Sequence, residues 1–298
     1  MSVQQEPTGR RSVQVEVEVP GTPEEVWQAI ATGPGISSWF MPTDVEEREG
    51  GAMMFHMGPG MDAPATVTGW EPPRSFRYEE RDWMPGTPGR PGAPPVATEI
   101  TVETSAAGRC IVRLVSSLFT SSDDWDGQLE SFEFGWTVYF RVLRLYLTRF
   151  RGLTCSKVHV IAPGAATEVE SWGRLTRSLG LEGIGAGQRI ATPPDAPPLA
   201  GTVEWIGTGR HLHHLLVRLD DPAPAPGCAP GCAPGCAPGC ACINAYTWNG
   251  VHVGVSLYLY GERAAAIAAR DEPRWQAWLG GAFPEPSSPS GTQAQACP

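Results

Sequence analysis

Residues 12–30 read SVQVEVEVPGTPEEVWQAI, and this stretch decides the fold of the first half of the chain. Four valines, beginning at Val13, alternate with polar residues, which is the two-residue period of a strand with one buried face and one wet face. A helix start follows directly. Thr22 and Glu25 have the spacing of a capping box, and Pro23 suits the first helical position. The apolar residues that come next at helical spacing predict an amphipathic helix.

The same pattern recurs 145 residues later in the chain. Val158 and Val160 alternate with polar neighbours before a second capping pair, Thr167 and Glu170, and Trp172 takes the place of the first tryptophan. A repeat at about half the chain length is typical of two copies of one domain, and 298 residues are enough for two cores of ordinary size.

The first half continues with strand signals. Segments 65–70, 75–83, 99–104 and 110–119 are separated by proline and glycine turns, which predicts an antiparallel meander. A stretch at 84–95 is so rich in Pro and Gly that we expect a long exposed loop there.

The longest predicted helix covers residues 125–150 and carries a continuous apolar stripe. The stripe must lie on the sheet, because the sheet offers the one apolar face large enough to cover it. Its members are Leu129, Phe132, Trp136, Phe140, Leu143, Leu147 and Phe150. The second half repeats this order and ends in a helix over 264–279 that we expect Pro273 to break. The predicted fold class is therefore α+β, with a curved antiparallel sheet wrapped around a C-terminal helix in each half.

Acidic residues outnumber basic ones, with 32 Asp and Glu against 22 Lys and Arg and a net charge of −10. This charge argues against a nucleic-acid partner, because phosphates repel it. We expect no membrane span, because no run of about 18 apolar residues occurs. Residues 1–11 lack the apolar segment of a signal peptide, so the expected location is the cytoplasm.

A set of short motifs accompanies the valine strand: Pro23-Glu24-Glu25-Val26-Trp27, Trp39-Phe40, Gly50-Gly51, Gly69 with Pro72-Pro73-Arg74, and Gly135-Trp136. Together, over residues 11–152, these motifs resemble the activator-of-heat-shock-ATPase homologue branch of the START-like (SRPBCC) superfamily. The resemblance implies a helix-grip fold, in which the bent sheet and the long helix enclose an apolar space. In relatives that space holds lipids, polyketides or hormones, or is nearly filled, so the fold by itself does not choose a function.

The predicted organisation is two tandem helix-grip domains, at 11–155 and 156–283, the second of them degenerate. The tails at 1–10 and 284–298 are expected to be disordered.

Aromatic and aliphatic residues are the candidates for a ligand-binding wall between sheet and helix, because aromatic side chains bury large areas with few rotamers. They suit a packed core equally well. The candidates are Trp39, Phe40, Phe55, Phe76, Tyr78, Phe132, Trp136, Phe140 and Leu143.

Catalytic candidates are few. Phe76, Tyr78 and Glu80 share one face of a predicted strand, so an inward Glu80 with a raised pKa is a candidate general acid or base, together with Tyr78 or His56. The alternative is an acid at the rim of the sheet that pairs with a neighbouring arginine.

Two motifs contain residue types that can ligate a metal. Ala-Pro-Gly-Cys occurs four times in tandem, which spaces four thiols evenly in a flexible loop, but zinc motifs more often use a two-residue gap and a distant second pair. These weak metal candidates are Cys228, Cys232, Cys236 and Cys240. His211 and His213 share a strand face without an identifiable third ligand. We therefore expect neither a metal nor a cofactor.

Three functions remain open at this point. The first is non-catalytic binding of an apolar small molecule, a lipid or polyketide-like metabolite, with the second domain as a stabilising partner or lid. The second is a polyketide cyclase or aromatase type of enzyme. The third is a co-chaperone-like module that binds an unidentified protein and has a filled core.

Overall fold

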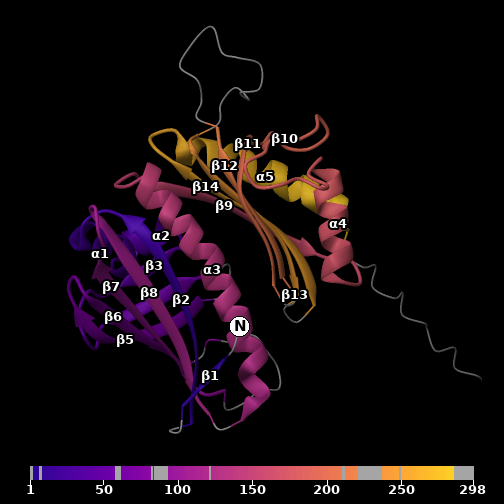
Figure 1. The fold of residues 1–298 in the computed structure, drawn as a ribbon. Coiled ribbons are helices and arrows are strands. Elements are labelled where there is room, and N and C mark those ends of the chain that lie inside the picture. The colour runs from indigo at the N-terminus through magenta and orange to yellow at the C-terminus, as the bar shows by residue number, and fades with distance from the viewer. Residues whose placement is uncertain are drawn as a thin grey trace, which may run out of the picture.

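The computed structural model describes residues 3–6, 9–57, 62–81, 83, 93–120, 122–209, 212–220, 237–247 and 250–284. Within this part the chain forms two antiparallel sheets with helices packed on them (Figure 1). The predicted fold class, α+β with two sheets that each pack a long helix, is confirmed.

The first sheet follows the order β1-β2-β8-β7-β6-β5-β4-β3. Strands β3 to β8 form a meander, and β2 pairs with β8 at the end of that meander. Its strands are β1 (Gln4–Gln5), β2 (Arg10–Pro20), β3 (Thr43–Val45), β4 (Ala52–His56), β5 (Asp62–Glu71), β6 (Ser75–Glu80), β7 (Val96–Thr104) and β8 (Arg109–Phe119). The valine strand is β2, and its register pairs Val15 with Leu114, so its buried face belongs to the core.

The first helix, α1 (Pro23–Ala31), begins at the predicted capping box. The Glu25 amide donates to the Thr22 hydroxyl at 3.3 Å, and the Thr22 amide donates to the Glu25 carboxylate at 2.9 Å. These two bonds satisfy amides that have no partner inside the helix. A short helix, α2 (Gly33–Ser37), follows directly.

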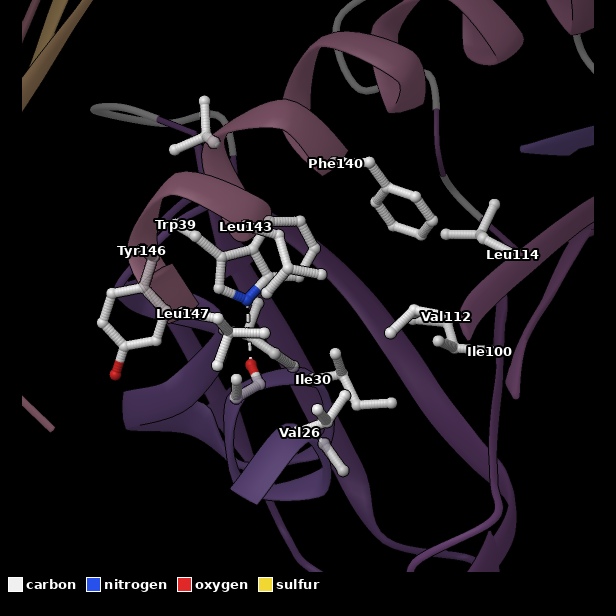
Figure 2. Close-up of a cluster of buried hydrophobic side chains, with 14 of the residues drawn as sticks. Val26, Ile30, Trp39, Ile100, Val112, Leu114, Phe140, Leu143, Tyr146 and Leu147 are labelled. Atoms are coloured by element: carbon white, nitrogen blue, oxygen red, sulfur yellow. Dashed lines mark hydrogen bonds between the residues drawn. The ribbon is translucent and has the colours of Figure 1, made fainter. Parts of the chain in front are cut away.

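The long helix α3 (Asp126–Arg149) lies across β2 and β8, after a 3-10 turn η1 (Asp123–Trp125). Its N-terminal end is tied to the sheet by the Arg11 guanidinium, whose Nε donates to Asp126 at 2.6 Å. The predicted apolar stripe faces the sheet, and most of it is buried in the cores of the first domain, as Figure 2 shows for Phe140, Leu143 and Leu147.

The second sheet follows the order β10-β11-β12-β13-β14-β9. Its strands are β9 (Cys155–Pro163), β10 (Arg189–Ala191), β11 (Ala200–Gly209), β12 (Leu212–Leu219), β13 (Gly239–Thr247) and β14 (Val251–Tyr260). Two helices, α4 (Glu168–Ser178) and α5 (Ala264–Ala282), cover one face of this sheet and enclose a core of its own.

The opposite face of the second sheet packs on α3, which therefore lies between the two sheets (Figure 1). The Tyr260 ring stacks on Phe150 with centroids 4.3 Å apart, and the Arg141 guanidinium lies 4.7 Å from the centre of the Trp205 ring. Leu216 and Cys240 join the core of the first domain. This sharing of one helix by two sheets was not predicted from the sequence.

Two expectations for the second half need correction. Pro273 does not break the last helix, because α5 runs through it to Ala282. Trp275 and Leu279, beyond the proline, are fully buried in the core of the second domain, and their burial outweighs one missing backbone hydrogen bond. In the second half only one of the two hydrogen bonds of the predicted capping box forms. The Glu170 amide donates to the Thr167 hydroxyl at 3.1 Å, and the reciprocal bond is not made.

Most of the predicted Pro/Gly loop, at 84–92, lies outside the described residues. No helix in the part of the chain that the structure describes is long and apolar enough to cross a membrane.

Candidate functional site

The nine wall candidates divide into two groups by their exposure. Six are buried, and three keep partial contact with solvent. The buried group is Trp39, Phe55, Phe76, Tyr78, Phe140 and Leu143, and the partly exposed group is Phe40, Phe132 and Trp136. The exposed members on α3 lie in its N-terminal half, whereas the buried members lie in its C-terminal half. Leu129, near the start of α3, is buried as well, so the partly exposed part of the stripe is the stretch around Phe132 and Trp136.

Phe40 is the centre of the accessible group. Its ring centroid lies 4.9 Å from that of Trp136, 4.5 Å from that of Tyr139 and 5.9 Å from that of Phe55. These tilted and edge-to-face contacts join the segment after α2 to both α3 and β4. Trp39, its neighbour, is 1% exposed, and its indole N–H donates to the Ala29 carbonyl at 2.8 Å (Figure 2).

A row of hydroxyl groups crosses the concave face where two apolar clusters meet. Tyr78 on β6 lies opposite Thr98 on β7 in the sheet register, and the Thr98 and Ser116 hydroxyl oxygens are 3.3 Å apart. The larger cluster holds Trp39 and Phe140, and the smaller one holds Val13, Trp83, Val96, Leu118 and Leu129. This row gives the otherwise apolar space a hydrogen-bonding strip.

Glu80 follows Tyr78 on the same inward face of β6, at the end of the strand. Glu80 as a whole is half-buried. The protein atoms around its carboxyl group exclude bulk water, and this desolvation raises the pKa of Glu80 to about 7. A carboxyl group in such surroundings exchanges protons near neutral pH. The two arginines considered as partners of Glu80 pair with other acids, Arg77 with Glu71 and Arg81 with Glu79.

Tyr78 and His56 differ in what they offer. Burial raises the pKa of Tyr78 well above its ordinary value, so its hydroxyl serves as a neutral hydrogen-bonding group. His56 points away from the core, between two carboxylates: its Nε2 is 3.0 Å from Asp44 and its Nδ1 is 3.1 Å from Asp62. These hydrogen bonds raise the pKa of His56. His56 therefore belongs to the outer face of the sheet rather than to the space under α3.

The sequence-based metal candidates fall only in part within the described residues. Cys228, Cys232 and Cys236 lie outside the described residues, as does His211. Cys240 is buried on β13 against the first domain, and its burial raises its pKa well above the ordinary value, which disfavours the thiolate that binds metals. His213 stacks on Trp172 with ring centroids 5.7 Å apart. Among the described residues no group of three or more His, Cys, Asp or Glu is placed to hold a metal ion.

Sequence reasoning missed two contributors to this region. Trp83 lies 5.2 Å from the Phe132 ring, centroid to centroid, and closes the smaller cluster beside the partly exposed stretch of α3. If the alternation from residue 75 continued, Trp83 would lie on the opposite face of the strand from Phe76. β6 ends at Glu80, so the alternation does not extend to Trp83, which is buried. Tyr258 and Lys157 of the second domain reach the Phe40 carbonyl, and no local signal pointed to them.

Residues 20–148 match the family model described as "Activator of Hsp90 ATPase homolog 1-like protein". No curated protein matches the chain significantly.

Solved structures with a similar fold include CalU16 from Micromonospora echinospora, with 20% identity, a TM-score of 0.38, and coverage of 49% of this chain and 83% of that chain. The Aha1 dimer from Colwellia psychrerythraea has 18% identity, a TM-score of 0.37, and coverage of 47% and 98%. The di-domain ARO/CYC BexL from the BE-7585A biosynthetic pathway has 11% identity, a TM-score of 0.41, and coverage of 93% and 99%. Similarity at this level identifies no shared ligand or activity.

Proposed function

We propose that the first domain, which matches the family model "Activator of Hsp90 ATPase homolog 1-like protein" over residues 20–148, binds an apolar small molecule of the lipid or polyketide-like class. The site is the space between the first sheet and the N-terminal half of α3. The observation that carries this proposal is the break in burial along the helix: the stripe is sealed at Phe140 and at Leu129, and its aromatic residues between them, Trp136 and Phe132, are partly exposed.

Physical chemistry supports an apolar occupant at this part of the helix. Partly exposed aromatic side chains keep apolar surface in water, and covering that surface contributes about 25 cal/mol per Å². Phe40, Trp136 and Phe132 supply such surface from two elements that face the same sheet. The hydroxyl row of Tyr78, Thr98 and Ser116 would orient one polar group on the ligand.

Native mass spectrometry of the full chain, purified from its own host, tests the proposal. The wild-type protein is expected to carry a co-purified apolar molecule. Trp136→Ala is expected to weaken its retention about tenfold, because one aromatic wall of the site is lost. Trp172→Ala is the matched control, since Trp172 is also a partly buried tryptophan but lies on α4 in the second domain.

Two outcomes would count against this function. Equal ligand content in the wild type and in Trp136→Ala would contradict the assignment of Trp136 to the wall of the ligand site. A wild-type protein that carries no apolar molecule, and takes up none from lipid or polyketide-like mixtures, would favour the protein-binding module with a filled core.

A second candidate function, acid–base catalysis on a bound carbonyl compound, is favoured by one observation: Glu80 sits inward at the mouth of the same space, with its pKa raised to about 7 by burial. In that case the Glu80→Gln protein should co-purify with an unconverted molecule whose mass differs from that of the wild-type ligand. Identical masses would assign Glu80 to ligand orientation and leave the binding function in place.

A further inference from the structure

Two backbone carbonyls of the first domain are held by side chains of the second domain. The Tyr258 hydroxyl donates to the Phe40 carbonyl at 3.1 Å, and the Lys157 ammonium donates to the same oxygen. The Tyr260 hydroxyl donates to the Ser38 carbonyl at 2.8 Å. Segment 38–40 directly follows α2, so the backbone carbonyls of this segment have no hydrogen-bond partner within that helix. The bonds that satisfy them cross the boundary between the domains.

The side chains of the same segment belong to the candidate ligand site. Trp39 fills the sealed core, with its ring centroid 6.1 Å from that of Phe140. Phe40 lies at the partly exposed stretch of α3, against Trp136, Tyr139 and Phe55. The ring of Phe40 therefore lies in the candidate ligand site, and its carbonyl is hydrogen-bonded by side chains of the second sheet.

We propose that the second domain acts as a clamp on the ligand site of the first domain, with Tyr258 and Lys157 as the positioning residues that hold Phe40 in its place on the wall. The clamp rests on the proposed function, because it assigns a role to the wall of that site. It gives the degenerate second domain a task that needs no ligand of its own. The proposed coupling between the second domain and the ligand site passes through the Phe40 carbonyl.

The surroundings of Lys157 show how closely the clamp is built. Lys157 is the only lysine of the chain, and it stands on β9 with its ammonium 4.7 Å from the centre of the Tyr258 ring. Burial lowers its pKa to about 8. A buried cation is tolerated when it is hydrogen-bonded and lies on an aromatic face, and both conditions are met here. The Tyr258 side chain also has two partners: its ring faces the Lys157 ammonium, and its hydroxyl donates to the Phe40 carbonyl.

The rest of the interface keeps the domains together without the clamp. Tyr260 stacks on Phe150 and lies 5.8 Å from the Tyr146 ring, and Leu216 and Cys242 are buried against the first domain. Removing the two donors to Phe40 should therefore loosen segment 38–40 at Phe40, while Tyr260 keeps its bond to Ser38 and the sheets stay docked. By linkage, a ligand that contacts the Phe40 ring should in turn tighten the docking.

The test compares the full-length wild type with the double variant Tyr258→Phe/Lys157→Met, which keeps both apolar stems and removes both donors. Tyr246→Phe is the control, because it removes a hydroxyl from the same face of the second sheet, on β13, where no bond to segment 38–40 is made. Two quantities are measured: hydrogen exchange of the Trp39 and Phe40 amides, and the affinity for Nile red, a neutral apolar dye, by fluorescence titration.

The Trp39 and Phe40 amides bond the Ile36 carbonyl at 3.2 Å and 2.9 Å, so their exchange reports opening of the segment. In the double variant we expect exchange about tenfold faster and Nile red binding about tenfold weaker, as the loss of two hydrogen bonds allows. The control should match the wild type. A circular dichroism melt of each protein verifies that all are folded.

Each other outcome is decisive. Unchanged exchange in the double variant would overturn the clamp. Faster exchange with unchanged dye affinity would leave the contact as a purely structural one and overturn the coupling to the site. If the wild type does not bind Nile red at all, the proposed function fails at that point, separately from the exchange result.

Discussion

Replacing Trp39 by alanine is expected to lower the free energy of unfolding by about 4 kcal/mol, which is typical of a large aromatic side chain removed from a closed core. Trp39 is 1% exposed, and it packs between Phe40 and Phe140. Its loss also leaves the Ala29 carbonyl without the indole donor (Figure 2). Chemical denaturation, followed by circular dichroism because a tryptophan is removed, measures the change.

Two companion variants separate the causes of that loss. Trp39→Phe keeps an aromatic ring but removes the N–H and part of the buried ring volume, so it should cost less than Trp39→Ala. Trp172→Ala removes a partly exposed tryptophan from α4, where less area is buried and a smaller loss is expected. A loss below about 1 kcal/mol for Trp39→Ala would mean that the core around it rearranges freely, contrary to its close packing.

The second large effect concerns Glu80 and pH. The pKa of Glu80 is raised in the folded protein from 4.5 to about 7, because burial disfavours its charged form. The folded state therefore binds this proton more tightly than the unfolded state, so the contribution of Glu80 to the free energy of unfolding is most favourable below pH 4.5. That contribution is lost as the pH rises toward 7 and stays lost above it. Glu80→Gln cannot ionise, so its advantage over the wild type should appear between those limits.

We expect Glu80→Gln to be about as stable as the wild type at pH 4.5 and more stable at pH 8. The upper limit of the gain is about 3 kcal/mol, and the partial solvent access of the side chain reduces it. Denaturant unfolding at the two pH values measures the difference. Glu79→Gln is the control, because Glu79 is the next residue on the outer face and pairs with Arg81 at 3.0 Å. A stability difference that does not change with pH would show that Glu80 is already well solvated.

Local patterns in the chain were sufficient for the elements of the first domain. The valine alternation gives β2, the Thr22 and Glu25 pair begins α1, and the apolar stripe defines α3 within one or two residues. These predictions hold because alternation, capping and helical spacing depend on neighbours that are close in the sequence. The aromatic set of the site was also within reach, since the residues facing a core follow from the same periods.

The state of that set was decided by the tertiary structure. Leu143 and Phe140 became closed core while Trp136 and Phe132, on the same stripe, kept access to water. The difference comes from what lies across from each turn of α3, and a periodic pattern carries no information about that. The proline in α5 makes the same point, because long-range burial of Trp275 outweighed a local signal.

What the sequence by itself determined is the kind of fold: two tandem units, their strands, their capped helices and the apolar stripe of α3. What only the tertiary structure decided is how these units meet. The second sheet packs its open face on α3, and Tyr258 reaches the carbonyl of Phe40, which is 218 residues away in the chain. Contacts at such separation depend on the docking of whole surfaces, and neither residue has a local pattern that specifies its partner.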